Sequence, residues 1–284
     1  MGKRERHFDK IAGYKCRFRS LSTEAIRHRL NEFGTGLYKE ARIALRQILE
    51  ERRQQTEGTP AMNEAEWLAC TDPLPMLDFL RDKATERKLR LFGLACCCRI
   101  VRLLTDQRSV NAVLVTDRYL EGTASREELN QAEMTARQAY ENALQTHDNA
   151  AFAAVSLAVD DPYQAARSAA AHSAYAVAHE LAGDQGSQAA LHEKYVGGLA
   201  SENKWQSAAL RHIIGNPFHP YPVPDHWPST VVQLAAAFTE GKDCGFALHD
   251  ALLDAGHPEL AAHFRQKEPH PKGCWVLDLV LGKP

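Results

Sequence analysis

Residues 85–104 read TERKLRLFGLACCCRIVRLL, and this stretch decides the fold of the chain. Apolar side chains occupy most of its positions, so a helix formed here has little polar face left. We therefore expect a central helix over 85–104 that is buried on most sides. Its apolar residues are Leu89, Leu91, Phe92, Leu94, Ala95, Ile100, Val101, Leu103 and Leu104.

The sequence after this stretch favours helices and disfavours strands. Between Arg126 and Ala182 there are 18 alanines and only three Val or Ile residues, a composition typical of closely packed helices. Nowhere do alternating runs of β-branched residues follow one another across hairpin turns. We expect a mainly α fold, a multi-helix bundle or an orthogonal packing of helical hairpins.

Helix start and stop signals recur along residues 62–284 and predict roughly eight or more helices there. The start signals are the capping boxes Asn63/Glu66 and Ser125/Glu128 and the pairs Asp72-Pro73 and Asp161-Pro162. The stop signals are Gly122, Gly183 and Gly256, which suit left-handed C-terminal caps.

The composition changes at residues 215–224, GNPFHPYPVP. This segment is too rich in proline for a regular helix and is expected to be an extended connection. Ser229 is expected to cap a helix that runs through Phe238. Further helices are expected near 245–254 and 258–265. The last element, 273–282, is expected to be a helix docked into the core, with a strand as the alternative.

The distribution of charge divides the chain near Met62. Residues 1–61 carry 14 Lys and Arg against 8 Asp and Glu, a net charge of +6, whereas residues 62–284 carry 20 against 28, a net charge of −8. Such an asymmetry indicates an appended interaction module. We expect a basic helical-hairpin module over 1–58 and an all-helical body over 62–284, with a further division near 215–228.

Two helices are expected in the N-terminal module. Ser22 suits the cap of the first, which the glycines of 34–36 end. The second has an apolar stripe at spacings of three and four, and a polar linker over 54–60 follows it. The stripe consists of Leu37, Ala41, Leu45, Ile48 and Leu49.

Composition limits where the protein acts. No stretch approaches eighteen consecutive apolar residues, and the N-terminus runs into mixed charged sequence, so we expect a cytoplasmic protein that does not enter a membrane. The cysteines are odd in number and three are adjacent, which indicates reduced thiols and not a disulfide framework. They are Cys16, Cys70, Cys96, Cys97, Cys98, Cys244 and Cys274.

Residues 62–284 also resemble an uncharacterised, paralogue-rich bacterial family with no established activity. The resemblance rests on NEAEWL at 63–68, RKLRLF at 87–92 leading into CCCR at 96–99, GNPF at 215–218 and GCWVLD at 273–278. It implies an all-helical body that begins near Met62, and it implies no catalytic residue. The chain departs from the family where Cys98 replaces the first of two basic residues after a Cys pair.

Cys96 and Arg102 have the Cys-x5-Arg spacing of phosphatases, in which a thiolate attacks phosphorus and the arginine binds its oxygens. That chemistry needs a loop of backbone amides before a helix. The intervening residues lie within a helical pattern that contains no glycine, so we expect a buried structural role for Cys96. Phosphate-loop, dinucleotide and hydrolase-elbow motifs are likewise absent from the sequence.

Thirteen histidines raise the question of a metal, and seven of them lie between His212 and His270. Their spacing matches neither a di-iron bundle nor a His-Glu-x-x-His site, and no Cys-x-x-Cys pair is present. Two weak candidate groups stay open: His172 with His179, seven residues apart on one helical face, and His263, His270 and Cys274. Capping, core or surface roles are favoured, so we expect no metal and no cofactor.

The basic N-terminus offers phosphate contacts and aromatic stacking. The residues expected to bind a partner are Lys10, Lys15, Arg17, Arg19, Arg27, Arg29 and Phe18. The net charge is modest for a nucleic-acid module, so docking on an acidic protein surface is the stronger interpretation.

These observations favour a non-enzymatic helical adaptor that binds a protein partner and recruits a second one through its N-terminal module. The alternative is an accessory factor that binds DNA or RNA through residues 1–29, and an unusual Cys/His-dependent enzyme comes third. In each case the tryptophans are expected to anchor the core or an interface. They are Trp67, Trp205, Trp227 and Trp275.

Overall fold

The structure is a computed structural model of the chain, and it describes residues 14, 15, 18, 26, 39–58, 62–142, 148–265 and 270–283. The mainly α fold is confirmed: the described residues form thirteen α-helices and one 3-10 helix, with no strand among them. The expected first helix of the N-terminal module lies almost wholly outside the described residues. None of the helices described is both long and apolar enough to cross a bilayer.

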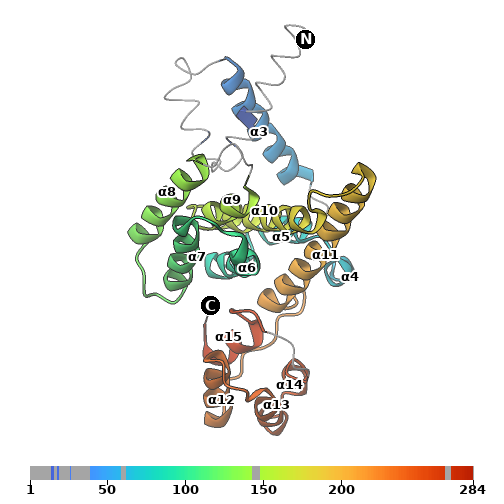
Figure 1. The fold of residues 1–284 in the computed structure, drawn as a ribbon. Coiled ribbons are helices and arrows are strands. Elements are labelled where there is room, and N and C mark those ends of the chain that lie inside the picture. Colours follow the sequence, from blue (N-terminus) through green and yellow to red (C-terminus); the bar gives the residue numbers. More distant parts are fainter. Residues whose placement is uncertain are drawn as a thin grey trace.

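Helices α4 to α11 form the body. Their bounds are α4 Glu64–Ala69, α5 Pro73–Leu80, α6 Glu86–Ile100, η1 Val101–Leu103, α7 Gln107–Leu120, α8 Arg126–Asn142, α9 Asn149–Leu157, α10 Pro162–Ala182 and α11 Gln188–Ile214. Helix α10 packs against α6, α9 and α11, and α8 packs against α7 and α9. Figure 1 shows α6 and α10 in the middle of the molecule, with α11 leading away toward the C-terminal helices.

The central helix is shorter than the sequence predicted. α6 ends at Ile100, a 3-10 turn follows, and Val101 is 41% exposed, so the expected burial does not extend to 104. Within α6 the prediction of burial holds, because Leu89, Leu91 and Phe92 are all buried. At Gly93 an added Cβ would lie 3.0 Å from Leu157 Cδ1, so its lack of a side chain lets neighbouring helices approach closely.

The local helix signals were mostly right. The Asn63/Glu66 box is formed, with backbone-to-side-chain bonds of 2.8 and 2.9 Å, and both Asp-Pro pairs start helices. The Ser125/Glu128 box is formed as well. The prediction that Ser229 caps its helix was wrong. Ser229 is the first residue of the helix, and Pro228, which has no side-chain donor or acceptor, occupies the N-cap.

The four last helices form a C-terminal unit with its own hydrophobic core. Their bounds are α12 Ser229–Thr239, α13 Gly245–Asp254, α14 Pro258–Ala262 and α15 Trp275–Leu281. Buried Val231, Leu248, Leu260 and Val276 meet in that core, whose members all follow residue 220. The terminal element is therefore the expected helix and not a strand. Figure 1 shows this unit, in orange and red, at the end of the molecule opposite α3.

The tryptophans occupy different environments. Trp67 is fully buried in the body core, whereas Trp227 and Trp275 pack on the core of the C-terminal unit. Trp205 is half-buried beneath the guanidinium of Arg99, which lies 4.1 Å from its ring centre.

In the N-terminal module, α3 spans Lys39–Gly58. Residues 54–58 are therefore helical, which corrects the expected linker, because the helix continues to the Gly58 that precedes Thr59-Pro60. Its buried stripe meets Phe18 and Ile26 in a small separate cluster. The members of that cluster are Tyr14, Phe18, Ile26, Ala41, Leu45, Ile48 and Leu49.

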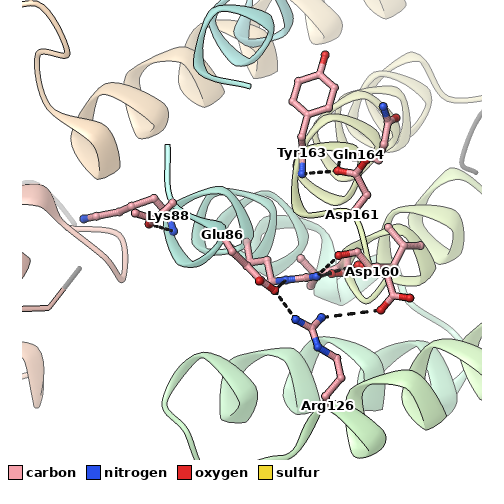
Figure 2. Close-up of polar contacts among 11 residues, drawn as sticks. Glu86, Lys88, Arg126, Asp160, Asp161, Tyr163 and Gln164 are labelled. Atoms are coloured by element: carbon pink, nitrogen blue, oxygen red, sulfur yellow. Dashed lines mark hydrogen bonds and ion pairs between the residues drawn. The ribbon is translucent and has the colours of Figure 1, made fainter. Parts of the chain in front are cut away.

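A buried arginine closes the body around α6. Arg90, 0% exposed, donates to the carbonyl oxygens of Leu157, Val159 and Asp160 at 3.3, 2.9 and 2.7 Å, and its Nε bonds Glu86 at 2.8 Å. These carbonyls lie at and beyond the C-terminal end of α9, where intrahelical partners run out. Figure 2 shows the rim of this network, in which Arg126 lies between Glu86 and Asp160.

Replacing Arg90 with methionine should lower the free energy of unfolding by about 3–5 kcal/mol, because three carbonyls, of which that of Leu157 is buried, lose a charged donor, and Glu86 loses its partner. Urea denaturation measures the change. The matched control is Arg118→Met, which breaks the exposed Arg118–Glu128 pair and should cost less than about 1 kcal/mol. Equal effects of the two substitutions would contradict the structural role of Arg90.

Candidate metal centre

Four potential metal ligands from separate parts of the chain meet between α11 and the C-terminal unit. His212 lies in the last turn of α11, His263 caps the end of α14, His270 lies in the segment before α15, and Cys274 is the N-cap of α15. One ligand atom from each can be chosen so that all four lie within 4.8 Å of one another. The structure thus brings together the weak candidates His263, His270 and Cys274 and adds a fourth residue.

The distances between these atoms suit a tetrahedral ion. His212 Nε2 lies 2.8 Å from His270 Nδ1 and 3.1 Å from His263 Nε2, which is itself 3.1 Å from Cys274 Sγ. Zinc bonds nitrogen at about 2.0–2.1 Å and sulfur at about 2.3 Å, so neighbouring donors in a tetrahedron lie roughly 3.3–3.6 Å apart. The three observed separations are within about half an ångström of that range.

Hydrogen bonding alone accounts poorly for this arrangement. A neutral imidazole nitrogen carries either one N–H or one lone pair. His212 Nε2 and His263 Nε2 each face two other ligand atoms, so each would have to share a single proton or lone pair between two partners. A central cation instead accepts one lone pair from each of the four atoms.

Close backbone contacts place the ligands. At Gly215, just after α11, an added Cβ would lie 3.1 Å from the Trp275 ring, so the end of α11 and the start of α15 are in contact. Gly273, beside Cys274, has a φ of 85° and lies under Leu91 of α6, whose Cδ1 would be 2.5 Å from an added Cβ. Both positions require glycine, and both fix the approach of a ligand-bearing segment.

Ion pairs hold α15 against α6 next to the cluster. Asp278 is buried and binds Lys88 Nζ at 2.6 Å and Arg87 Nη1 at 2.7 Å. Lys88 also donates to the carbonyl oxygen of Gly273 at 3.0 Å, directly before Cys274. The Asp278 carboxylate of α15 therefore binds two cationic side chains of α6, close to the N-cap position that Cys274 occupies.

Burial favours the neutral form of two of the imidazoles, His212 and His263, because it lowers the pKa of both. Burial lowers the pKa of His212 to about 4, with a further contribution from His270. Burial, together with the other two imidazoles, lowers the pKa of His263 to about 3. Burial raises the pKa of the Cys274 thiol to about 12, against the opposing effect of the Leu277 and Val276 amides and Lys88. His212 and His263 thus present lone pairs at neutral pH, and the thiol must release a proton to bind a cation.

Aromatic rings surround the cluster. Phe264 stacks on His270 with centroids 5.1 Å apart, Phe238 meets the same ring edge-on at 5.1 Å, and Trp275 lies 5.9 Å from His263. These contacts limit the rotation of the His263 and His270 rings, while all three histidines of the cluster are half-buried and Cys274 is buried. The site therefore combines four convergent donors with an apolar surround, as structural zinc sites do.

The other pair of candidate histidines lies elsewhere. On α10, His172 Nδ1 lies 3.1 Å from Asn149 Oδ1 and its ring packs on Phe152, whereas His179 packs on Tyr195 of α11. Neither belongs to a group of three or more potential ligands among the residues that the structure describes.

Few of the expected partner-binding residues fall within the structure. Lys10, Arg17, Arg19, Arg27 and Arg29 lie outside the described residues. Lys15 is half-buried. Phe18 is 6% exposed and stacks on Tyr14 with ring centres 5.7 Å apart, so its ring faces the core of the module and is not available to stack on a base. The partner-binding role of these residues, Phe18 included, stays a prediction.

The three adjacent cysteines lie at the end of α6, and the first two are buried as expected. Cys96 and Cys97 are buried in α6, and burial raises the pKa of both thiols, so neither is poised as a thiolate nucleophile. Arg102 pairs with Glu180, away from any phosphate-binding loop. Cys98 is the exposed member of the three.

His212 is the ligand that sequence reasoning missed. It precedes His263 by 51 residues and lies inside a long helix, so no spacing rule connects it to the other three. The available signal was its position three residues before Gly215, which places it in the last turn of a helix that ends in a glycine cap.

No family model, curated protein or solved structure matches the chain. The resemblance to a bacterial family stays an expectation, and the geometry of the four ligands is the basis for the proposed function.

Replacing Gly273 with alanine should destabilise the protein more than the same change at Gly122. Both glycines have positive φ, 85° and 72°, which costs an alanine about 1–2 kcal/mol. An added Cβ at Gly122 meets nothing within 4 Å, whereas at Gly273 it meets Leu91, so Gly273→Ala should cost roughly 1–3 kcal/mol more. Equal losses in urea denaturation would refute the close contact.

The buried imidazole of His172 should make stability depend on pH. Burial lowers the pKa of His172 to about 4 from an ordinary 6.5, so the unfolded chain takes up its proton first as pH falls. Stability is therefore retained above pH 6.5 and is lost between 6.5 and about 4. His172→Gln should flatten that slope by up to about 1.4 kcal/mol per pH unit, as measured by urea denaturation at several pH values. An unchanged slope would show that His172 does not titrate in this way.

Proposed function

We propose that this protein binds one transition-metal ion, preferentially Zn²⁺, through His212, His263, His270 and Cys274, and that the ion has a structural role. The observation that carries the proposal is the convergence of the four donor atoms within 4.8 Å of one another. Three of them are imidazole nitrogens and the fourth is a thiol, a donor set that zinc favours.

The donor set argues against other common ions. Calcium and magnesium prefer carboxylate, carbonyl and water oxygens. The four residues of this cluster offer nitrogen and sulfur donors and no carboxylate or carbonyl ligand. A thiol with imidazoles suits zinc, cobalt or copper, and a tetrahedral arrangement favours zinc among these. Phe238, Phe264 and Trp275 pack on His270 and His263 and hold these two ligands in place, which suits an ion with a structural role.

Four protein donors complete a tetrahedron, so no ligand position is left for a substrate. Catalytic zinc sites usually keep one position for water. The arrangement therefore argues against catalysis at the ion and supports a structural role for it. In this proposal the protein is a helical interaction protein whose C-terminal unit is held in place by a metal.

Cobalt substitution tests the proposal directly. The full chain, stripped of metal and titrated with Co²⁺, should take up one equivalent and develop the visible bands of tetrahedral Co²⁺ and a thiolate charge-transfer band in the near ultraviolet. Zn²⁺ added afterwards should displace the cobalt and remove both features. Metal content by mass spectrometry of the purified protein gives an independent count.

Matched variants assign the ligands. Cys274→Ser should abolish the charge-transfer band, and His263→Ala should weaken Co²⁺ binding by roughly 100-fold or more, because a three-donor site remains. The controls are Cys98→Ser and His226→Ala, exposed residues outside the cluster that should leave the spectrum unchanged. Failure of the full chain to bind either ion, or equal effects of ligand and control variants, would refute the proposal.

A further inference from the structure

The four ligands do not belong to one unit of the fold. His212 is part of α11, which packs against α10, α6 and α5 of the body. The other three, His263, His270 and Cys274, are carried by the C-terminal unit, whose core is separate from that of the body. An ion held by all four would join the two units with metal–ligand bonds.

The remaining contacts between these units are largely ionic. Besides the pairs that Asp278 makes with Lys88 and Arg87, Lys272 binds Asp117 of α7 at 2.5 Å and Glu121, the C-cap of α7, at 3.1 Å. Lys283 lies 4.0 Å from the same Glu121. Lys272, 44% exposed in its side chain, is open to solvent, so salt weakens its pairs.

Apolar contact across the boundary is narrow. It includes Trp275 against the backbone of Gly215 and Leu91 over Gly273. The large apolar side chains of the C-terminal unit are used in its own core, among them Leu248, Leu252 and Val280. Hydrophobic burial therefore contributes little to docking compared with its contribution inside each unit.

We infer that the bound ion controls docking of the C-terminal unit, residues 229–283, onto the body, by joining His212 to His263, His270 and Cys274. With the ion, docking is insensitive to salt. Without it, docking depends on the buried pairs of Asp278 and the exposed pairs of Lys272, and it weakens as ionic strength rises because salt screens the exposed pairs. The inference rests on the proposed function, since it needs a metal at this site.

Undocking of the C-terminal unit must be distinguished from unfolding of either unit. Each has its own buried core, so α12 to α15 can keep their helices when the contact with α6 and α7 opens. Loss of docking should therefore be seen in the boundary residues of α15 and α6 and not in the interior of the body. That pattern separates undocking from general unfolding.

Hydrogen–deuterium exchange of the full chain measures docking. Zinc-loaded and metal-free protein should be compared at about 0.05 M and about 1 M NaCl, between which the Debye length falls from above 10 Å to about 3 Å. In the metal-free protein, high salt should speed exchange at 275–281 and at 86–92 by about threefold or more, because it screens the exposed pairs of Lys272. In the zinc-loaded protein, salt should change exchange there by less than about twofold.

His212→Gln provides a second test that does not require a metal-free protein. This variant keeps the three ligands of the C-terminal unit, so at excess Zn²⁺ it should still bind the ion, and its docking should nevertheless become salt-sensitive. His226→Gln, an exposed control, should behave like the unmodified chain.

The outcomes distinguish the two proposals. Absence of Zn²⁺ and Co²⁺ binding by the full chain overturns the proposed function, and this inference with it. Binding of one ion, together with salt-insensitive exchange in both the metal-free protein and zinc-loaded His212→Gln, overturns the inference and leaves the metal centre in place. If metal-free protein loses protection throughout the body, the His212→Gln comparison decides: salt sensitivity supports the inference and salt insensitivity overturns it.

Discussion

The close approach of α10 to α6 is the packing on which the rest of the structure depends. Small residues make it possible: Gly93 on α6 faces Ala166 and Ala169 on α10, which are fully buried. Because α10 also packs against α9 and α11, its position sets theirs. Arg90 completes this arrangement by donating to the carbonyls at the end of α9, where helical hydrogen bonding stops. Alanine-rich helices thus provide close packing, and one buried guanidinium satisfies the backbone that the packing leaves without partners.

From this framework α11 extends to the C-terminal unit and ends where the candidate metal centre lies. Gly215 ends the helix and accepts the face of Trp275, and Gly273 lets Cys274 approach beneath Leu91. The metal centre is therefore a property of the boundary between two units, each with its own core. An ion placed there adds strong, directional bonds to a boundary that has few apolar contacts of its own, which is the usual reason for a structural zinc site in a small helical unit.

Agreement between sequence and structure was best where the signals are local. The Asn63/Glu66 box and the Asp161-Pro162 start depend on residues within three positions of one another, and both are formed. The errors have physical causes of their own. The central helix stops at Ile100 because its last turn tightens to a 3-10 turn at the surface, and the predicted linker after α3 is helical to Gly58.

The sequence by itself determined the helical class, most of the helix caps and the apolar stripes. It also put His263, His270 and Cys274 within 12 residues of one another, which made them a weak candidate group although no metal was expected. Periodicity and capping are local chemistry, so they can be read along the chain. Only the tertiary structure added His212, and only it placed Phe18 in a core. Both depend on which helix faces meet, and that is decided by packing among residues far apart in sequence, as with the 51 residues that separate His212 from His263.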